Sequence, residues 1–407
     1  MQLKELKARK IANSRGEETI EVIAETKNGK VFASSPSGRS RGKNEAEPFS
    51  FKGIDFSVSF ANAIGKKLQF DKTVFNYFQD LEKVEKLIRS YDQSKNWNVV
   101  GGNTVFAIES AILKAMALDE KKELWEFLNP KAKSLPLPVG NCIGGGVHIK
   151  KDRKPDIQEF LVIPKTNHFY DSYFVSLQAY KEVKQELSKK DEIWRGELTD
   201  ENAMAASLKT EEILDLLKEV SFRINEKMDV KLDLGMDVAA STLWNKDHYN
   251  YKNPKNSRDK ETQVEYILAL IKKYNLFYVE DPLHENDFEG FAEINEIAGK
   301  NCLIVGDDLI CTQIDRLKEA IDKKSINAVI VKPNQNGSLL QTKELVDLAQ
   351  KHKIIPIISH RSGETLDSTI ADLAVSWKIK FIKTGILGKE RFAKLNRLLK
   401  IERQIKD

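Results

Sequence analysis

The sequence of 407 residues has few cysteines and no long apolar run. Its three cysteines, Cys142, Cys302 and Cys311, are odd in number and lack the spacing of metal ligands, so we expect buried, reduced thiols in an intracellular protein. No stretch approaches the length of about 18 apolar residues that a membrane span needs, and the first residues contain no apolar signal-peptide core. These absences predict a cytoplasmic location and no membrane span.

An excess of charge of one sign is also absent. Lys and Arg total 65 and Asp and Glu total 61, which leaves a net charge of +4. Because nucleic-acid binders need a basic field that neutralises phosphates, this balance argues against nucleic acid as a partner. A small anionic substrate is still compatible, since a locally basic site can bind it. The length and a hydrophobic content of 41% allow two domains with sizeable cores.

Residues 1–133 show the pattern of an α+β domain, in which a three-stranded sheet is followed by helices. The turn at 13–16 and the Asn28-Gly29 pair separate alternating runs, which predicts strands joined by tight turns. Between about 55 and 130, apolar residues recur at three- and four-residue spacing, as in helices. The Leu-Pro-Leu-Pro segment at 135–138 favours extended chain, so a second domain is expected at 134–407.

The second domain contains short apolar strands that each end in a charged residue. These strand-end residues are Asp237, Glu280, Asp307, Lys332, His360 with Arg361, and Lys383. From Glu280 onward the steps are 27, 25, 28 and 23 residues, which suits one strand, one helix and two loops. Charged groups at the carboxyl ends of successive strands are typical of a (β/α)8 barrel enzyme. The segment from Arg391 onward is expected to be a charged amphipathic helix that packs on the barrel surface.

In such a barrel, three carboxylates and two lysines would face one another. Asp237, Glu280 and Asp307 have no supporting Cys or His, so they suit a hard divalent cation, Mg²⁺ before Zn²⁺. Lys332 or Lys383 would be partly desolvated and close to other cations and to the metal, which would lower the lysine pKa and allow it to act as a general base. The alternative is a structural salt bridge between the lysines and the acidic strands.

This charge distribution predicts a reaction class. Mg²⁺ on a substrate carboxylate would stabilise an enediolate while a lysine removes the α-proton. Arg361 and Ser362 suit an oxyanion such as phosphate, and an acid in Asp200-Glu201 could protonate a leaving hydroxyl. We therefore expect β-elimination of water from a metal-bound acid. His148, which follows three glycines, is either a pocket residue or an ordinary loop histidine.

Motifs along the whole chain resemble enolase (phosphopyruvate hydratase). The most specific are Ser359-His360-Arg361-Ser362-Gly363-Glu364-Thr365 and Gly306-Asp307-Asp308-Leu309, joined by Asn13-Ser14-Arg15-Gly16, Pro36-Ser37-Gly38, Gln158-Glu159-Phe160, Leu234-Gly235-Met236-Asp237, Val279-Glu280-Asp281-Pro282 and Val331-Lys332-Pro333-Asn334-Gln335. The resemblance implies an N-terminal α+β domain followed by an enolase-type (β/α)8 TIM-like barrel that opens ββαα before its βα units. It also implies homodimers, or octamers built from dimers.

The resemblance implies dehydration of 2-phosphoglycerate to phosphoenolpyruvate with two Mg²⁺ per active site. The implied metal ligands are Asp237, Glu280 and Asp307 for the first ion, and Ser40, together with the substrate phosphate, for the second. The implied catalytic residues are Lys332 as the base at C2, Glu201 as the acid, Glu159, His148, His360 and Lys383. The implied substrate-binding residues are His148, Glu159, Lys332, Arg361, Ser362, Lys383 and Ser40, with Arg361 and Ser362 on the phosphate.

Several loops depart from the pattern of this family. The departures are Arg39 and Arg41 where small residues and threonine are usual, Asn44 for histidine, Gly144 for asparagine, Thr199 and Asn202 for glycine, and a segment from His148 to Glu159 about two residues longer than usual. The irregular spacing around Glu201 keeps Glu197 as an alternative acid. The changed loops allow a paralogue that acts on a phosphonate analogue or another hydroxy acid. A non-catalytic, enolase-like binding protein is a third possibility.

Overall fold

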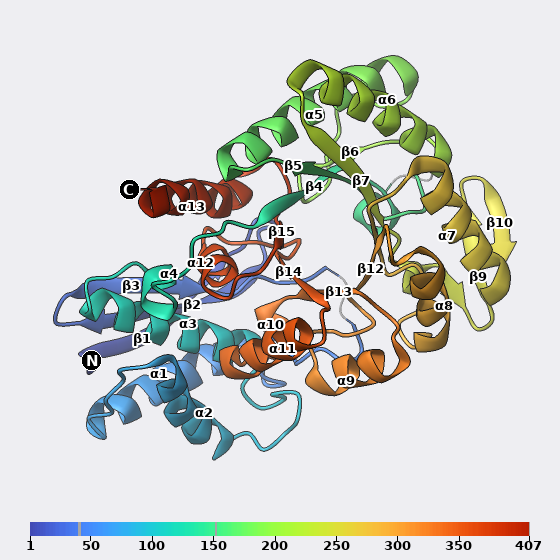
Figure 1. Ribbon diagram of the computed structural model, residues 1–407. Helices are drawn as coiled ribbons and strands as arrows, with labels where there is room; N and C mark the ends of the chain where they lie inside the picture. Colours follow the sequence, from blue (N-terminus) through green and yellow to red (C-terminus); the bar gives the residue numbers. More distant parts are fainter. Residues whose placement is uncertain (40–41, 151–152, 407) are drawn as a thin grey trace.

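The computed structural model describes residues 1–39, 42–150 and 153–406. Its N-terminal part is a sheet with helices, and the remainder is a barrel surrounded by helices (Figure 1). Ser40 and Arg41, which the sequence analysis singled out, lie outside the described residues.

The N-terminal part contains an antiparallel sheet in the order β1-β2-β3. Its strands are β1 (Glu5–Ala12), β2 (Glu18–Thr26) and β3 (Gly29–Ser34), and its helices are α1 (Ile54–Phe70), η1 (Phe78–Asp80), α2 (Leu81–Arg89), α3 (Gly102–Asp119) and α4 (Leu124–Leu128). The apolar face of β2, with Ile20, Val22 and Ala24, is buried, and almost every residue of α3 is buried as well. The predicted three-stranded sheet with helices is confirmed.

A closed barrel of eight strands forms the second part of the described chain. Its strands are β4 (Leu137–Gly144), β5 (Glu159–Lys165), β7 (Lys231–Asp237), β11 (Tyr278–Glu280), β12 (Leu303–Gly306), β13 (Ala328–Val331), β14 (Ile355–Ser359) and β15 (Phe381–Lys383), and β15 pairs with β4 to close the ring. β5 runs antiparallel to β4 and β7, whereas the other neighbours are parallel. Apolar side chains such as Val139, Leu161 and Ile330 fill the interior.

Helices surround this barrel (Figure 1). They are α5 (Phe169–Lys190), α6 (Thr210–Met228), α7 (Lys260–Tyr274), α8 (Phe288–Ala298), α9 (Ile314–Lys323), α10 (Pro333–Asn336), α11 (Leu339–Lys351), α12 (Thr369–Ser376) and α13 (Lys389–Lys406). The short elements are β6 (Met204–Ala205), η2 (Gly146–His148), η3 (Ala240–Thr242) and a ribbon of β8 (Trp244–Asn245), β9 (His248–Lys252) and β10 (Lys255–Arg258). Because α5 and α6 both precede β7, the ββαα opening is confirmed.

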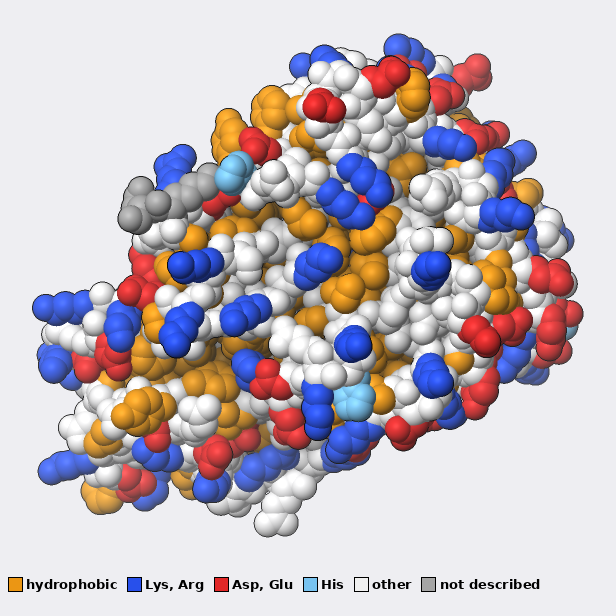
Figure 2. All heavy atoms as spheres, viewed as in Figure 1, with side chains coloured by type: hydrophobic (Ala, Val, Ile, Leu, Met, Phe, Trp, Pro, Cys, Tyr) orange, Lys and Arg blue, Asp and Glu red, His pale blue; other side chains and the backbone are white. Residues whose placement is uncertain are grey.

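The surface agrees with the balanced charge of the sequence. Basic and acidic side chains are both scattered over the face seen in Figure 2.

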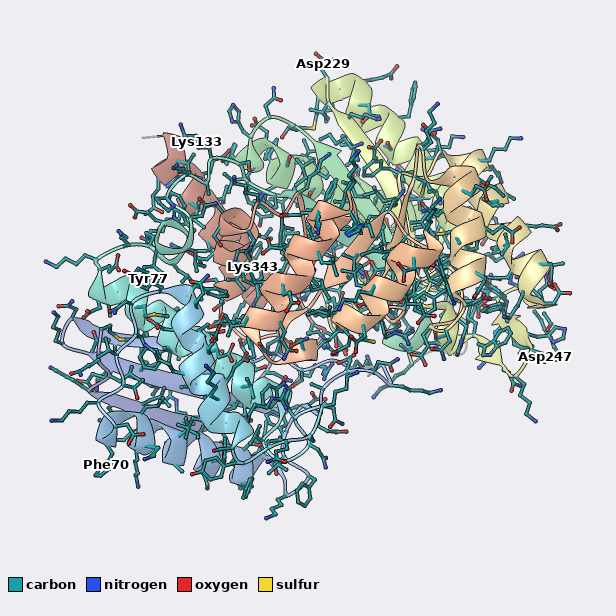
Figure 3. The ribbon with its side chains drawn as sticks, turned by 60° about the horizontal axis from the view of Figure 1, so that its bottom comes forward. Phe70, Tyr77, Lys133, Asp229, Asp247 and Lys343 are labelled. Carbon is teal, nitrogen blue, oxygen red and sulfur yellow. The ribbon has the colours of Figure 1, made fainter. Side chains whose placement is uncertain are left out.

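Figure 3 shows Phe70 and Tyr77 on the N-terminal part and Lys343 on α11 of the barrel part. Among the described helices, none is both long and apolar enough to cross a membrane.

The two parts meet beside the carboxyl ends of the barrel strands. Ser37 and Gly363 exchange two backbone hydrogen bonds of 2.8 and 2.9 Å, and Ser14 donates its N–H to Glu364 O at 2.7 Å. On the other side of this contact, Trp97 Nε1 donates to Asn336 O at 2.9 Å. The N-terminal part is therefore bonded directly to the loops that follow β13 and β14. The division at residue 133 stays a prediction.

Candidate active site

A pocket opens at the carboxyl ends of the barrel strands, and both parts of the chain line it. The N-terminal part contributes Gly38, Arg39 and Glu45. The barrel contributes His148, Gln158, Glu159, Glu201, Asp237, Ala239, Thr242, Asp281, Asp307, Asp308, Lys332, Ser359, His360, Arg361, Ser362 and Lys383. Most of the residues that the sequence placed in one site thus line one pocket.

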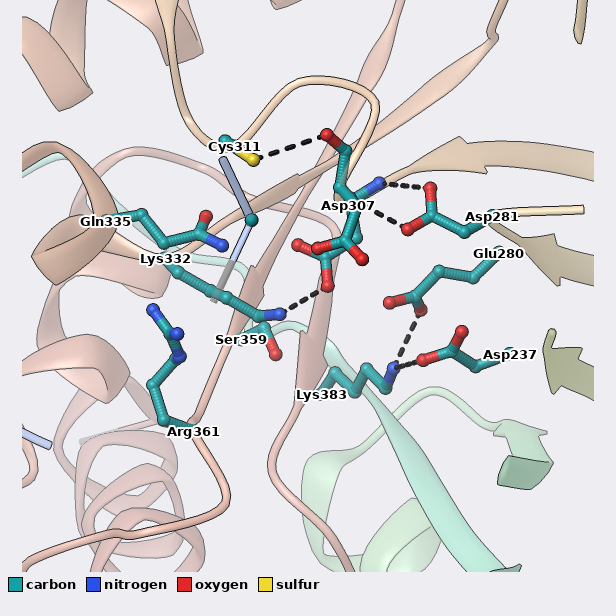
Figure 4. A network of polar contacts seen from close by, with 12 residues as sticks. Asp237, Glu280, Asp281, Asp307, Cys311, Lys332, Gln335, Ser359, Arg361 and Lys383 are labelled. Atoms are coloured by element: carbon teal, nitrogen blue, oxygen red, sulfur yellow. Dashed lines mark hydrogen bonds and ion pairs between the residues drawn. The ribbon is translucent and has the colours of Figure 1, made fainter. Parts of the chain in front are cut away.

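The predicted metal ligands lie on three neighbouring strands (Figure 4). Asp237 ends β7 and is paired in register with Glu280, which ends β11, while Asp307 directly follows β12. All three are buried, and burial together with the charge of Asp237 raises the pKa of Glu280 to about 8. Within the described part of the chain, Glu280 Oε1 and Asp307 Oδ1 have no hydrogen-bond partner. Buried, unpaired carboxyl oxygens of this kind fit a divalent cation, whose charge would favour the ionised form of Glu280.

The backbone that carries Asp307 is held by the side chain of Asp281. Its carboxylate accepts the N–H of Asp307 at 2.9 Å and that of Asp308 at 2.7 Å, which fixes the chain where β12 ends. Asp281, Asp307 and Asp308 also offer carboxylate oxygens within 4.8 Å of one another. The role of Asp281 could not be predicted from the sequence, because an Asp in a strand-ending Asp-Pro pair is common in turns.

The two predicted lysines extend towards these carboxylates (Figure 4). Lys383 Nζ lies 3.0 Å from Asp237, 2.8 Å from Glu280 and 3.1 Å from Glu159, and Lys332 Nζ donates to Asp307. Burial lowers both lysine pKa values, but the carboxylates outweigh it and hold them above the ordinary range. The expected lowering of the pKa is therefore wrong for this arrangement. The salt bridges between lysines and acidic strands, which were the alternative interpretation of the sequence, are present. They leave Glu280 Oε1 and Asp307 Oδ1 without a partner among the described residues.

The loop before β6 brings Glu201 into the pocket. Glu201, Glu159 and His148 offer ligand atoms within 4.8 Å of one another, and His360 Nε2 lies 3.6 Å from Glu201 Oε2. Burial raises the pKa of Glu159 well above its usual range. Burial also acts to raise the pKa of Glu201, but the nearby His360 and His148 outweigh burial and hold that pKa well below its usual range. Of the two carboxyl groups, Glu159 is therefore the more readily protonated, and Glu201 the more readily ionised.

Glu197, the alternative acid, lies elsewhere. Its side chain is exposed and accepts the N–H of Arg195 at 2.8 Å, and it does not line the pocket. The structure thus brings Glu201 and not Glu197 to the predicted site.

The predicted anion site is already linked to the N-terminal part. Arg361 binds Glu45 through both guanidinium Nη atoms at 3.0–3.2 Å, and Arg15 donates to Ser362 Oγ. Sequence reasoning missed Glu45, because nothing local distinguishes it from other loop acids and its partner lies 316 residues away.

Two of the departures from the family pattern contact each other. Arg39 Nη1 lies 2.7 Å from Asp200 Oδ2, so the N-terminal loop is tied to the loop that carries Glu201. Two further departures, Gly144 and Thr199, fit each other in volume. A Cβ at Gly144 would lie only 2.5 Å from Thr199 Cγ2, so the larger residue at 199 requires the smaller one at 144. Asn44, by contrast, is exposed and outside the pocket lining.

Comparison with known proteins identifies the family. Residues 3–128 match the family model "Enolase, N-terminal domain", and residues 132–407 match "Enolase, C-terminal TIM barrel domain". The chain is 38% identical to the enolase of Methanosphaera stadtmanae and 37% identical to that of Methanothermobacter thermautotrophicus, in each case over 99% of this chain and 97% of the relative. It is 36% identical to the enolase of Thermoplasma acidophilum over 98% of both chains. The chain therefore belongs to the enolase family.

Proposed function

We propose that the chain catalyses the reversible dehydration of 2-phosphoglycerate to phosphoenolpyruvate, as a Mg²⁺-dependent lyase of glycolysis and gluconeogenesis. The observation that carries this proposal is the pocket in which buried carboxylates with unpaired oxygens face two lysines. Membership of the enolase family, whose curated members carry the name of this activity, supports it.

Asp237, Glu280 and Asp307 would hold the first Mg²⁺. Their oxygens are hard ligands, and the unpaired ones, Glu280 Oε1 and Asp307 Oδ1, are available to a cation. When bound, Mg²⁺ would supply positive charge that stabilises the enediolate form of the substrate carboxylate. A second ion, held with the help of Ser40, stays a prediction because Ser40 lies outside the described residues.

Lys332 is the proposed base. Its Nζ, which now donates to Asp307 as an ammonium, would first lose a proton to solvent and would then, as a neutral amine, accept the proton from C2 of 2-phosphoglycerate; positive charge held by Asp307 would favour that loss by lowering the lysine pKa. Lys383, surrounded by Glu159, Asp237 and Glu280, would remain protonated and face the substrate carboxylate.

The other side of the pocket would assist the leaving group. Glu201 would help the 3-hydroxyl to depart, with Glu159 as its support and with His148 and His360 lining the space around it. Arg361 and Ser362 would bind the phosphate. Charge-assisted hydrogen bonds from a guanidinium suit phosphate oxygens, and both residues line the pocket.

The purified protein is expected to form phosphoenolpyruvate from 2-phosphoglycerate, seen as an increase in ultraviolet absorbance. A chelator should reduce the rate to background, because Asp237, Glu280 and Asp307 cannot stabilise the enediolate without a cation. Addition of excess Mg²⁺ should restore the rate. A chelated enzyme that retains its activity, or no product at millimolar substrate, would contradict the proposal.

A second candidate function is the dehydration of a phosphonate analogue or another hydroxy acid. The Arg39–Asp200 contact favours it, because this ion pair adds a guanidinium to the pocket lining between two altered loops. Comparing kcat/KM for 2-phosphoglycerate and its phosphonate analogue under identical Mg²⁺ decides between them. A higher value for the phosphonate would favour the second candidate.

We also propose a homodimer, or an octamer built from dimers, and a cytoplasmic location. Family membership supports both. Light scattering of the purified chain should give twice or eight times the chain mass of 46.3 kDa. A monomeric mass would contradict the assembly.

A further inference from the structure

Helix α13 carries a buried arginine that the proposed mechanism does not use. Arg391 is 0% exposed, in a helix that the sequence predicted to be charged, amphipathic and packed on the barrel surface. A guanidinium stays protonated in proteins, so Arg391 keeps a positive charge in the interior. Its nearest carboxylate contact is Glu390, 4.0 Å from Nη1. Burial of a cation without a close anion is unfavourable for stability, which calls for another reason for its presence.

The side chain of Arg391 reaches the loop that follows β14. Its Nη2 donates to Ser362 O at 3.0 Å and lies 3.4 Å from Arg361 O. Its Nε and Nη1 are buried and have no hydrogen-bond partner among the described residues. Arg391 therefore binds the backbone of the two residues that are proposed to hold the substrate phosphate.

The peptide between Arg361 and Ser362 shows what this contact achieves. In a planar trans peptide the C=O and the N–H point in opposite directions, so the N–H of Ser362 points away from Arg391. Ser362 is 6% exposed and lines the pocket. Within the described part of the chain its N–H has no acceptor. Buried N–H groups without an acceptor are rare in native proteins, and one in a pocket that the Arg361 side chain also lines suits an anion.

Arg391 also lies against the loop that carries the proposed acid. A Cβ at Gly385 would be 3.2 Å from Arg391 Cγ, 3.6 Å from Glu201 O and 3.6 Å from His360 Cε1. The aliphatic stem of Arg391 therefore lies near both the anion-binding loop and the loop of Glu201, and its positive charge helps to hold the pKa of Glu201 below its usual range.

We propose that Arg391 is a positioning residue for the anion site, which holds the carbonyls of Arg361 and Ser362 so that the Ser362 N–H stays directed at a substrate phosphate oxygen. This role rests on the proposed function, because it assumes that the substrate carries a phosphate bound at Ser362. Arg391 does not itself touch the substrate. It acts through the backbone of the loop and through the positive charge beneath it.

The test compares Arg391→Met with Arg397→Met. Arg397 lies on the same helix and pairs with Asp372 and Glu123, away from the pocket. Without its charge and its backbone contacts, Arg391→Met should bind inorganic phosphate about 10- to 100-fold more weakly, as measured from the rise of the thermal midpoint with phosphate concentration. Its midpoint without phosphate should stay within about 3 °C of that of the unmodified chain, because an unpaired buried charge is removed.

Arg397→Met should behave in the opposite way. Its midpoint should fall by about 5 °C or more, because Asp372 is left buried and unpaired, while phosphate affinity is unchanged. Unchanged phosphate affinity in Arg391→Met, or a midpoint as low as that of Arg397→Met, would overturn the positioning role. If Arg391→Met does not fold, Arg391→Lys decides, since it retains the charge but lacks the planar fork. Tenfold weaker phosphate binding supports the role and unchanged binding overturns it.

Phosphate binding is measured without turnover, so the two proposals can fail separately. A chain that binds phosphate in an Arg391-dependent manner but forms no phosphoenolpyruvate would overturn the proposed dehydration alone. A chain that dehydrates 2-phosphoglycerate with equal KM in the unmodified and Arg391→Met forms would overturn the positioning role alone. A rise in KM with little change in kcat is the expected pattern.

Discussion

Replacement of Lys332 by methionine lowers kcat for 2-phosphoglycerate by about 10²- to 10⁴-fold, the usual contribution of a general base. The same change should abolish exchange of the C2 proton with deuterated solvent, which is followed by proton NMR. Lys332 is the proposed acceptor of that proton, and in the structure its Nζ already donates to Asp307 in the pocket. Loss of the base therefore removes the first step and not only the overall reaction.

Lys343→Met is the matched control. Lys343 lies on α11 of the barrel part (Figure 3) and, among the described residues, pairs only with Asp347 on the same helix, so its loss should leave kcat and exchange unchanged. If Lys332→Met retains C2 exchange, another group is the base and Lys383 becomes the next candidate. If Lys332→Met preserves the biological role of the protein in a cell, the chain would fit the non-catalytic binding protein instead.

Replacement of Glu201 by glutamine should also lower dehydration by about 10²- to 10⁴-fold, yet leave C2 exchange in place. The amide keeps the shape of the side chain but neither carries a proton to the hydroxyl nor interacts as an anion with His360, 3.6 Å away. Exchange depends on Lys332 and the metal ligands and not on Glu201. Measuring both dehydration and C2 exchange therefore distinguishes loss of the acid, Glu201, from loss of the base, Lys332.

The matched control for this change is Glu197→Gln. Glu197 is exposed and lies outside the pocket, so glutamine there should leave kcat unchanged. Loss of dehydration in Glu197→Gln with full activity in Glu201→Gln would reverse the assignment. Glu159→Gln is informative beside them, because burial raises the pKa of Glu159 and favours its protonated form. If only this variant loses dehydration, Glu159 and not Glu201 delivers the proton.

The sequence was most informative where a residue ends a parallel strand. Asp237, Glu280 and Lys383 could be predicted as neighbours, because strand period and helix spacing place such residues at one end of a barrel. Glu159 lies at the beginning of its strand, since β5 runs antiparallel to β7 and pairs Glu159 with Asp237. A search for charged strand ends cannot find it, and only the resemblance to a family indicated it.

The sequence could not predict which side chains pair over long separations or which charged side chains are buried. Glu45 lies in a loop without periodicity, and Arg391 occurs in a helix that also carries exposed cations such as Lys400, so nothing in the sequence marks it as buried. The pKa expectation for Lys332 was wrong for a related reason. Burial and nearby cations could be inferred from strand order, but the contact with Asp307 that outweighs them depends on side-chain geometry.

The bonds between the turn at 13–16 and the loop at 362–364 have a consequence for the synthesis of the protein. Ser14 and Ser362 are 348 residues apart in the chain. At a translation rate of about 5–20 residues per second, Ser14 is made roughly 20–70 s before its partner. During this interval the N-terminal sheet can fold, but its face for the barrel has nothing to cover it. A nascent chain therefore has no anion site until β14 and its loop have left the ribosome, and that exposed face is where we expect chaperones to bind.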